Sequence, residues 1–202
     1  ALDPPSIPSH YKAASINDLV IDHRVDIRKF EDLQSIINNS EPDFVFHLAA
    51  QPLVKHSYIE PLETYETNIL GTLNVLESLR TLKKPCVVVM ITSDKCYDNV
   101  EWIWGYREND RLGGSDPYSA SKGAAELVIR SFIKSFFPKN GLIRIGIGRA
   151  GNVIGGGDWA QNRVVPDCFR SWTKGNEVTI HNPNSTRPWQ HVLEPLSGYL
   201  KL

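Results

Sequence analysis

Three short apolar segments, separated by helical patterns, constrain the fold of this chain more than any other feature. Segment 87–92 reads Val-Val-Val-Met-Ile-Thr, which predicts a strand buried on both faces because β-branched and apolar residues occupy successive positions. Segments 44–50 and 142–147 have the same character. Such strands, alternating with helices, form parallel sheets with helices on both faces.

The segments between these strands predict amphipathic helices. Apolar residues recur at helical spacing in 28–38 and 61–82, and a third helix is expected over 117–137. We therefore predict an α/β fold, a Rossmann-like doubly wound parallel sheet, over residues 1–150. After residue 151 Gly, Pro, Asn and Trp replace the periodic apolar residues, so 151–202 is expected to begin a smaller, loop-rich substrate lobe interleaved with that domain.

Composition excludes several classes of protein. The formal net charge of −1 gives no support for nucleic-acid or membrane-surface binding, and no apolar run is long enough to span a bilayer. The three cysteines are scattered, and the Cys/His spacing of a metal site is absent. We expect free thiols, a cytoplasmic location and no metal.

The pair Tyr118 and Lys122 is the first candidate for chemistry. Residues four apart on a helix face the same side, and a nearby cation lowers the pKa of a phenol toward the range of a general base. Surface helices often carry the same spacing without function. Here Asp116-Pro117 is a helix-start signal, which places Tyr118 in the first helical turn.

Ser93, Asp94 and Lys95 follow the strand 87–92 directly. Ligands of parallel α/β sheets bind beyond the carboxyl ends of the strands, so these side chains are expected at the active-site rim. A serine hydroxyl there can hydrogen-bond a substrate oxygen, and the next two residues can act as acid and base. The alternative is a simple turn, which Ser and Asp also favour.

With these residues in place, the chain resembles the extended short-chain dehydrogenase/reductase family, whose catalytic triad is Ser/Thr, Tyr and Lys. Within it, the chain is similar to the nucleotide-sugar 4,6-dehydratases. The most specific stretches are Thr-Ser-Asp-Lys-Cys-Tyr at 92–97 and Thr-Arg-Pro-Trp-Gln-His-Val at 186–192. Stretches 48–54, 64–72 and 149–159 add to the likeness, which runs from end to end.

The resemblance implies a role for each catalytic residue. Tyr118 would take the proton of the sugar 4-hydroxyl while NAD+ takes hydride from C4, and Lys122 would lower the pKa of Tyr118 and hold the nicotinamide ribose. Ser93 would steady the 4-oxygen. Asp94 matches the family acid that protonates the leaving 6-hydroxyl, after which the hydride returns to C6. The enzyme is then a lyase with no net oxidation.

Lys95 departs from the pattern of the dehydratases that act on dTDP-glucose or GDP-mannose, which usually have Glu as the base at C5. An ammonium must lose a proton before it serves as a base. The branch that acts on CDP-glucose is similar to this sequence in having Lys. The resemblance therefore implies CDP-glucose as substrate and leaves the identity of the C5 base open.

The resemblance also implies binding residues outside the triad. The cofactor-binding set comprises Asp26, Ile27, Leu48, Ala49, Ala50 and Asn68, besides Tyr118 and Lys122. The substrate-binding set comprises Ser93, Asn152, Arg163 and Arg187. A guanidinium suits a diphosphate because it offers a bidentate fork, although each arginine can also form an ordinary surface salt bridge. For Asn68 the alternative is a structural asparagine, and His47 is expected to be a hydrogen-bonded core residue.

A Gly-x-Gly-x-x-Gly match at 146–151 is a false dinucleotide fingerprint. The true motif turns from a strand into a helix, whereas this one leads into Asn-Val-Ile-Gly-Gly-Gly. The true loop should belong to a first βαβ unit that we do not find. We therefore expect a fragment with an incomplete NAD-binding domain, lacking that loop and the C-terminal part, which binds NAD poorly on its own.

Two alternatives to the CDP-glucose dehydratase remain open. One is another nucleotide-sugar dehydratase or a 4-epimerase of the same family; an epimerase needs no acid and base for water loss, so Asp94 and Lys95 discriminate. The other is a truncated, non-catalytic piece. The resemblance further implies a homodimer formed by helix 61–82 and the helix that begins near Tyr118.

Overall fold

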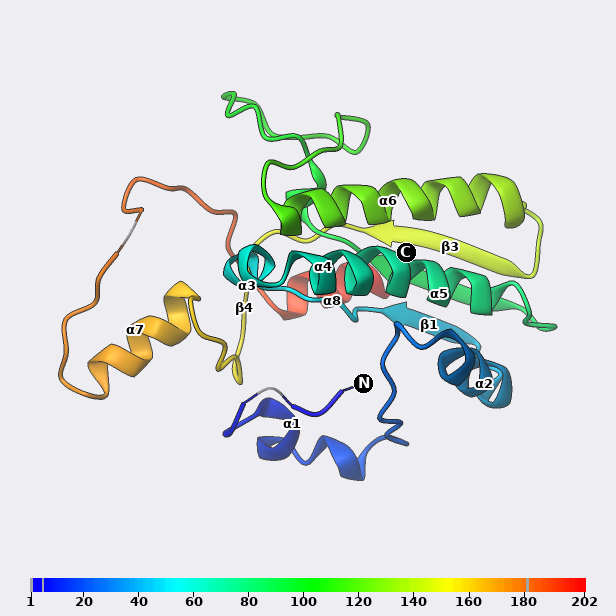
Figure 1. Ribbon diagram of the computed structural model, residues 1–202, viewed down its shortest axis with the longest axis horizontal. Coiled ribbons are helices and arrows are strands. Elements are labelled where there is room, and N and C mark those ends of the chain that lie inside the picture. Colours follow the sequence, from blue (N-terminus) through cyan, green and yellow to red (C-terminus); the bar gives the residue numbers. More distant parts are fainter. Residues whose placement is uncertain (1, 5, 181) are drawn as a thin grey trace.

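A parallel three-stranded sheet forms the centre of the molecule (Figure 1). The structure is a computed structural model and describes residues 2–4, 6–180 and 182–202. Strands β1 (Phe44–His47), β2 (Cys86–Ile91) and β3 (Ile143–Gly148) lie in that order, with Val45 opposite Val88 and Val88 opposite Ile145. This confirms the predicted parallel α/β sheet, since each strand starts within one residue of its expected position.

One face of the sheet is covered by three helices. These are α2 (Phe30–Ser40), α5 (Gly71–Leu79) and α6 (Pro117–Phe136), and Figure 1 shows α5 and α6 running beside each other along the sheet. Leu76 and Leu79 are fully buried in the resulting core. Burial of each leucine side chain stabilises the fold by roughly 1.5–3 kcal/mol.

The other face of the sheet is covered mainly over β3. There α8 (Leu193–Tyr199) brings the Tyr199 ring within 3.0 Å of where a Cβ on Gly148 would lie, so a side chain at Gly148 would collide. Phe44 and Phe46, on the same face of β1, are 63% and 40% exposed. Both faces therefore carry helices, as expected, but the described residues cover the second face incompletely.

The segment expected as one helix over 61–82 is divided. After α3 (Val54–Ile59), α4 (Pro61–Tyr65) passes into a π-helical turn, Glu66–Leu70, before α5 begins. A π turn accommodates one extra residue per turn and is frequent at functional sites. The buried residue of this turn is Asn68.

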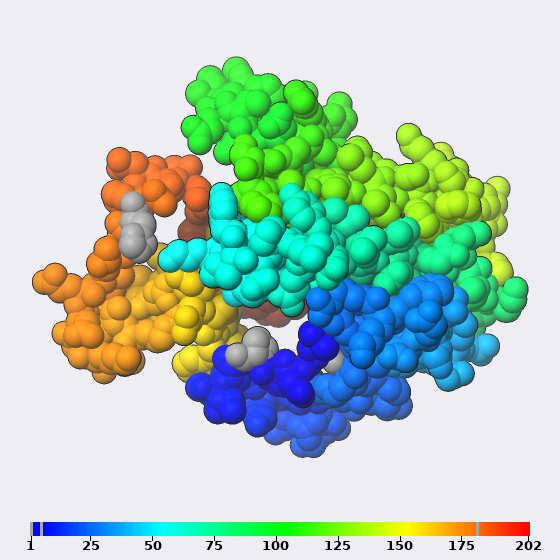
Figure 2. Space-filling model, viewed as in Figure 1, coloured from blue at the N-terminus to red at the C-terminus, as the bar shows by residue number. Residues whose placement is uncertain are grey.

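The remaining elements are short. At the N-terminal end lie α1 (His10–Ala13) and a 3-10 turn, Ile16–Asp18, and a second 3-10 turn, Asp94–Cys96, follows β2. Residues 98–114 project from the body as the green segment in Figures 1 and 2. Beyond β3, β4 (Val153–Ile154) pairs with β5 (Gln190–His191), and α7 (Val164–Trp172) lies between them. The domain boundary near residue 150 stays a prediction.

Candidate active site

The start of α6 places Tyr118 and Lys122 inside the molecule. Asp116 caps the helix, because its Oδ1 accepts from the Ser119 backbone N–H at 3.0 Å, and Pro117 occupies the first helical position. The Tyr118 backbone N–H donates to Ser57 Oγ at 3.2 Å. Tyr118 and Lys122 are each 8% exposed, so the alternative of a surface pair is wrong.

Ser93, Asp94 and Lys95 form a compact turn at the carboxyl end of β2. Ser93 Oγ donates to Asp94 Oδ1 at 3.0 Å and accepts from the Lys95 backbone N–H at 3.2 Å. Lys95 Nζ lies 3.7 Å from Asp94 Oδ2. The Asp94 backbone N–H donates to the carbonyl of Ala150 at 3.0 Å, so the turn is tied to the chain that leaves β3. Ser93, Asp94 and Lys95 therefore form a turn, and this turn also places their polar groups at the carboxyl end of β2.

The electrostatics of Tyr118 differ from our expectation. Burial raises the pKa of the Tyr118 phenol, an interaction with the Ser93 side chain lowers it, and the charge of Asp94 raises it again, with a raised pKa as the net result. The cation that lowers this pKa is Arg163; Lys122 is not among the main contributors. Burial of the phenol dominates the pKa of Tyr118 here, and the lowering of that pKa by Lys122 stays a prediction.

Lys122 is a largely buried lysine. Burial lowers the pKa of Lys122 to about 8, and no hydrogen bond of its Nζ is observed among the described residues. A buried ammonium is costly unless a partner is supplied. The site thus offers up to three N–H donors near Tyr118, a set that suits vicinal hydroxyl groups such as those of a ribose.

His47 is a core residue, as expected. Its Nε2 lies 3.0 Å from Thr72 Oγ1, and burial, together with the charge of Lys122, lowers its pKa to about 4. The imidazole is therefore neutral at physiological pH.

Asn68 connects the π turn to both neighbouring parts of the site. Its Oδ1 accepts from the Gln51 backbone N–H at 2.8 Å, and its Nδ2 donates to the Gln51 carbonyl at 3.1 Å and to Ser121 Oγ at 2.8 Å. These contacts match the structural alternative for Asn68, and its cofactor role stays a prediction. The sequence analysis missed Gln51 and Ser121; the only signal for Ser121 was its place between Tyr118 and Lys122.

The expected cofactor residues lie along one edge of the sheet. Leu48, Ala49 and Ala50 follow the end of β1 as loop, not as the last residues of the strand, and the first two are exposed. Asp26 accepts hydrogen bonds from Arg28 Nε at 2.9 Å and Nη2 at 2.6 Å, and Arg28 holds the pKa of this carboxyl below its usual value. The Ile27 carbonyl accepts from Asn74 Nδ2 at 2.9 Å.

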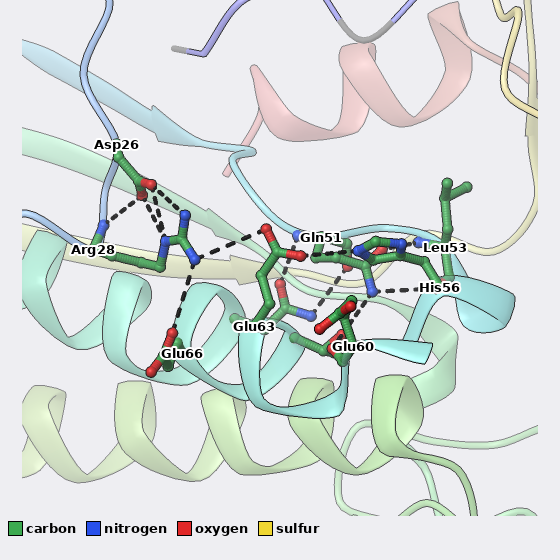
Figure 3. Close-up of polar contacts among 10 residues, drawn as sticks. Asp26, Arg28, Gln51, Leu53, His56, Glu60, Glu63 and Glu66 are labelled. Carbon is green, nitrogen blue, oxygen red and sulfur yellow. Dashed lines mark hydrogen bonds and ion pairs between the residues drawn. The ribbon is translucent and has the colours of Figure 1, made fainter. Parts of the chain in front are cut away.

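A polar surface hollow lies beside Asp26. Figure 3 shows Arg28 reaching from Asp26 toward Glu63 and Glu66, each 3.8 Å from its Nη1. The hollow, of about 330 Å³, is lined by Asp26, Arg28, Lys29, Glu66 and Leu70. Both Asp26 oxygens are already paired with Arg28, so a ligand here would have to share them.

The expected substrate residues are not gathered into one cluster. The Asn152 carbonyl accepts from the Gln190 backbone N–H at 3.0 Å, at the junction of β4 and β5. Arg163 pairs with Asp158 at 3.2 Å, with both side chains about two-fifths exposed. Arg187 is exposed and donates to the carbonyl of Thr186 at 2.7 Å. Arg163 alone is linked to the catalytic residues, through its effect on the pKa of Tyr118.

Several exclusions hold for the described residues. Among them, no group of three or more His, Cys, Asp or Glu side chains is arranged to hold a metal ion. A search of the same residues finds no helix with the length and hydropathy of a membrane span. Residues 146–151 run from β3 into a loop and then into β4, not into a helix, which confirms that this glycine pattern is not a dinucleotide fingerprint.

Comparison with known proteins gives a consistent family. The family model described as GDP-mannose 4,6 dehydratase matches residues 8–201. The chain is 55% identical to CDP-glucose 4,6-dehydratase of Salmonella typhimurium over 99% of this chain and 57% of that protein. It is 31% identical to CDP-paratose 2-epimerase of Salmonella typhi over 55% of this chain and 37% of that protein. The chain thus spans about half the length of these curated relatives.

Solved structures share the fold. UDP-glucose 4-epimerase of Thermus thermophilus, in complex with NAD, is 27% identical, with a TM-score of 0.74 over 89% of this chain and 59% of that one. RMD of Pseudomonas aeruginosa, complexed with NADPH, is 26% identical, with a TM-score of 0.76 over 91% of this chain and 62% of that one. These likenesses confirm the Rossmann-like α/β fold class.

Proposed function

The chain belongs to the GDP-mannose 4,6-dehydratase family, and from this premise we propose that it carries the catalytic centre of an NAD-dependent lyase that converts CDP-glucose to CDP-4-dehydro-6-deoxyglucose. The observation that carries the proposal is the 55% identity to a CDP-glucose 4,6-dehydratase across 99% of this chain. Lys95 supports the same substrate, because the family resemblance implies Lys after the acid in the branch that acts on CDP-glucose, and this chain has Lys95 after Asp94.

The residues present fit a bound nicotinamide cofactor. The largely buried side chain of Lys122 lies one turn from Tyr118 on α6, and the loop Leu48-Ala-Ala50 lies beyond the carboxyl end of β1, where dinucleotides bind in such sheets. Lys122 would hold the nicotinamide ribose. The chemistry that NAD+ supplies is a reversible hydride transfer, in which hydride leaves C4 of the sugar and is later delivered to C6.

The chain's own residues handle the protons. Tyr118 accepts the proton of the 4-hydroxyl, and Ser93 steadies the oxygen as the C4 ketone forms. The ketone acidifies the C5–H bond; a base takes that proton, the C6–O bond breaks, and Asp94 protonates the departing hydroxide to give water. A proton then returns to C5. Lys95, whose Nζ lies 3.7 Å from Asp94 Oδ2, is our candidate for the C5 base.

Arg163 and Arg187 are proposed to bind the diphosphate of the substrate, and Asn152 to contact the sugar. The charge of Arg163 acts on the pKa of Tyr118, which supports this assignment. A guanidinium can pair with two phosphate oxygens at once.

We also propose a homodimer located in the cytoplasm. Large apolar side chains on neighbouring helices face solvent, among them Leu62 at 70%, Leu70 at 49% and Leu127 at 58% exposure. Exposed apolar patches of this kind mark interaction surfaces. The three cysteines are free thiols, which accords with a reducing compartment.

Incubation of the full-length protein with CDP-glucose tests the proposal. We expect a 4-keto, 6-deoxy product that absorbs in alkali as a hexulose does, with no net consumption of NAD+. Turnover of dTDP- or GDP-sugars without turnover of CDP-glucose would overturn the choice of nucleotide. Interconversion of two 4-hydroxy sugars without loss of water would identify a 4-epimerase.

A further inference from the structure

Glu126 is a buried carboxylate that the proposed chemistry does not use. It lies on α6 on the same face as Tyr118 and Lys122, one turn beyond the lysine, and is only 1% exposed. Its oxygens accept from Arg149 through both Nε, at 2.8 Å, and Nη2, and from Arg130 Nη2 at 2.8 Å. A carboxylate this deep is stable only because these cations surround it.

The ionic state of this group follows from its neighbours. Burial works to raise the pKa of Glu126, but the hydrogen bonds and charge of Arg149, aided by the Cys96 thiol and Arg130, leave it below its usual value. Glu126 is therefore ionised at neutral pH. Burial and the Glu126 charge raise the pKa of Cys96 to about 12, so the thiol stays protonated beside it.

Glu126 and Arg149 hold both ends of segment 92–97, which contains Ser93, Asp94 and Lys95. At one end, Thr92 Oγ1 donates to Glu126 Oε2 at 3.1 Å. At the other end, Arg149 Nη1 donates to the Tyr97 hydroxyl at 2.6 Å, and its guanidinium lies 4.6 Å from the centre of the Tyr97 ring. The side chain of Arg149 is 11% exposed, so these contacts are shielded from water.

This arrangement joins the two halves of the site. Helix α6 carries Tyr118 and Lys122, whereas segment 92–97 carries the proposed acid and its neighbouring lysine. Among the described residues, two polar links from this segment toward α6 run through Glu126 and Arg149, and a third joins Ser93 to Tyr118. Thr92 and Asp94 also bond Gly148 and Ala150 at the end of β3. The links through Glu126 and Arg149 are charge-assisted, so they resist displacement of the segment.

We propose that Glu126 and Arg149 form a positioning pair that sets the place of Asp94 and Lys95 relative to Tyr118 during the loss of water. The proposal rests on the proposed dehydratase function. Neither residue touches the reacting atoms. Loss of the pair should slow the elimination of water more than the oxidation at C4, because Tyr118 and Lys122 are held by α6 itself and Ser93 is the one residue of the oxidation step that lies on the segment.

Arg149→Lys in the full-length, NAD-loaded protein is the main test. A lysine keeps a positive charge beside Glu126, but a single ammonium cannot replace the fork that also reaches Tyr97. Arg130→Lys is a matched control, since Arg130 binds the same carboxylate from a side chain that is 38% exposed, and its other hydrogen bond among the described residues is to the Glu108 carbonyl. Tyr97→Phe removes only the acceptor of one hydrogen bond and serves if Arg149→Lys does not fold.

A misplacement of about 1 Å can cost about 100-fold in rate, so we expect kcat of Arg149→Lys to fall by that order, with KM for CDP-glucose unchanged. For Tyr97→Phe, which loses one hydrogen bond, we expect a fall of about fivefold, and for Arg130→Lys less than about threefold. In single turnovers of Arg149→Lys and of Tyr97→Phe, the 340 nm absorbance of the reduced cofactor should accumulate, because C4 is oxidised before water leaves.

The outcomes distinguish a failure of the proposed function from a failure of the positioning role of Glu126 and Arg149. If the wild-type protein does not act on CDP-glucose, the proposed function fails. If it does, but Arg149→Lys and Tyr97→Phe keep wild-type kcat, or slow oxidation and elimination equally, the positioning role is wrong and the pair only stabilises the fold.

Discussion

Residues 30–150 and residues 151–202 differ sharply in how much of each is buried. The first region contains the sheet, the three helices on its covered face and the buried residues Tyr118, Lys122 and Glu126. In the second region Pro166 is the only buried residue among those described. Tyr118 and Lys122 are therefore packed in the interior, Asp94 and Lys95 lie at its partly exposed rim, and Arg163 and Arg187, proposed for substrate binding, lie on exposed segments.

The difference teaches which interactions exist before a ligand arrives. Asn68, Glu126 and Arg149 make several protein contacts each and hold the catalytic segments in place without a ligand. Among the described residues, the guanidinium of Arg187 donates to the carbonyl of its own neighbour, Thr186, and our proposal assigns it to a substrate anion. Substitutions in the first region should change kcat or stability, and those in the second should change KM.

Replacement of Tyr118 by Phe should have the largest effect. The ring stays buried, but the group that accepts the 4-hydroxyl proton is lost, and a positioned general base contributes about 100- to 10,000-fold in rate. We expect kcat for CDP-glucose to fall by about 1000-fold with little change in KM, measured by formation of the 4-keto product. If the variant keeps more than about a tenth of wild-type kcat, Tyr118 is not the group that accepts the 4-hydroxyl proton.

Replacement of Lys122 by Met should stabilise the cofactor-free protein. Burial lowers the pKa of Lys122 to about 8 from 10.5. Below pH 8 Lys122 is charged in both the folded and the unfolded protein, so the full cost of burying the charge is present. Between pH 8 and 10.5 only the unfolded chain holds the proton, so this cost disappears as the pH rises. The variant should gain about 3 kcal/mol at pH 7 and almost nothing at pH 10.5.

Urea unfolding at the two pH values measures this gain. Lys134→Met, at an exposed position of the same helix, is the control and should change the free energy of unfolding by less than about 0.5 kcal/mol at either pH. Equal effects of the two substitutions at pH 7 would mean that Lys122 is not buried as a cation.

Replacement of Asn68 by Ala should destabilise the first region. It leaves the buried backbone N–H and carbonyl of Gln51 without partners, which costs about 2 kcal/mol. Asn184→Ala, at an exposed position of the second region, should change stability by less than about 0.5 kcal/mol. Thermal unfolding of both variants measures this difference. Similar melting temperatures for Asn68→Ala and Asn184→Ala would contradict the stabilising role of Asn68.

Replacement of Arg187 and Arg163 by Gln should have the smallest effects and different signatures. We expect Arg187→Gln to raise KM for CDP-glucose about 10-fold, with kcat and its pH profile unchanged, since a charged hydrogen bond contributes about 1.5 kcal/mol. Arg163→Gln should also move the rising limb of the kcat–pH profile to higher pH, because loss of this cation raises the pKa of Tyr118. Identical profiles would remove Arg163 from the vicinity of Tyr118.

Periodic patterns predicted most of the first region. The apolar runs predicted β1, β2 and β3, and the Asp116-Pro117 signal predicted the start of α6, because local propensity and burial agree there. The π turn around Asn68 was not predictable from periodicity, since its cause is a tertiary one: Asn68 bonds Gln51 and Ser121 from other elements. The strand pair β4–β5 was missed because each strand is two residues long.

The candidate catalytic residues were identifiable from the sequence by residue type, but the pKa values of their side chains were not. Tyr118, Lys122 and Ser93 stand out by motif, yet the raised pKa of Tyr118 depends on burial and on Asp94, which only the folded structure reveals. Trp159 and Trp189, whose size favours a packing role, are 45% and 46% exposed. Their surroundings in the second region contribute too few apolar neighbours to bury them.

The central claim is that the buried site removes hydride from C4 and returns the same hydride to C6 as water is lost. CDP-glucose labelled with deuterium at C4, converted by the full-length protein and analysed by NMR, tests it most directly. The account predicts a 4-keto product whose deuterium has moved to C6. A 4-keto product without deuterium, or deuterium retained at C4 of the sugar, would contradict it.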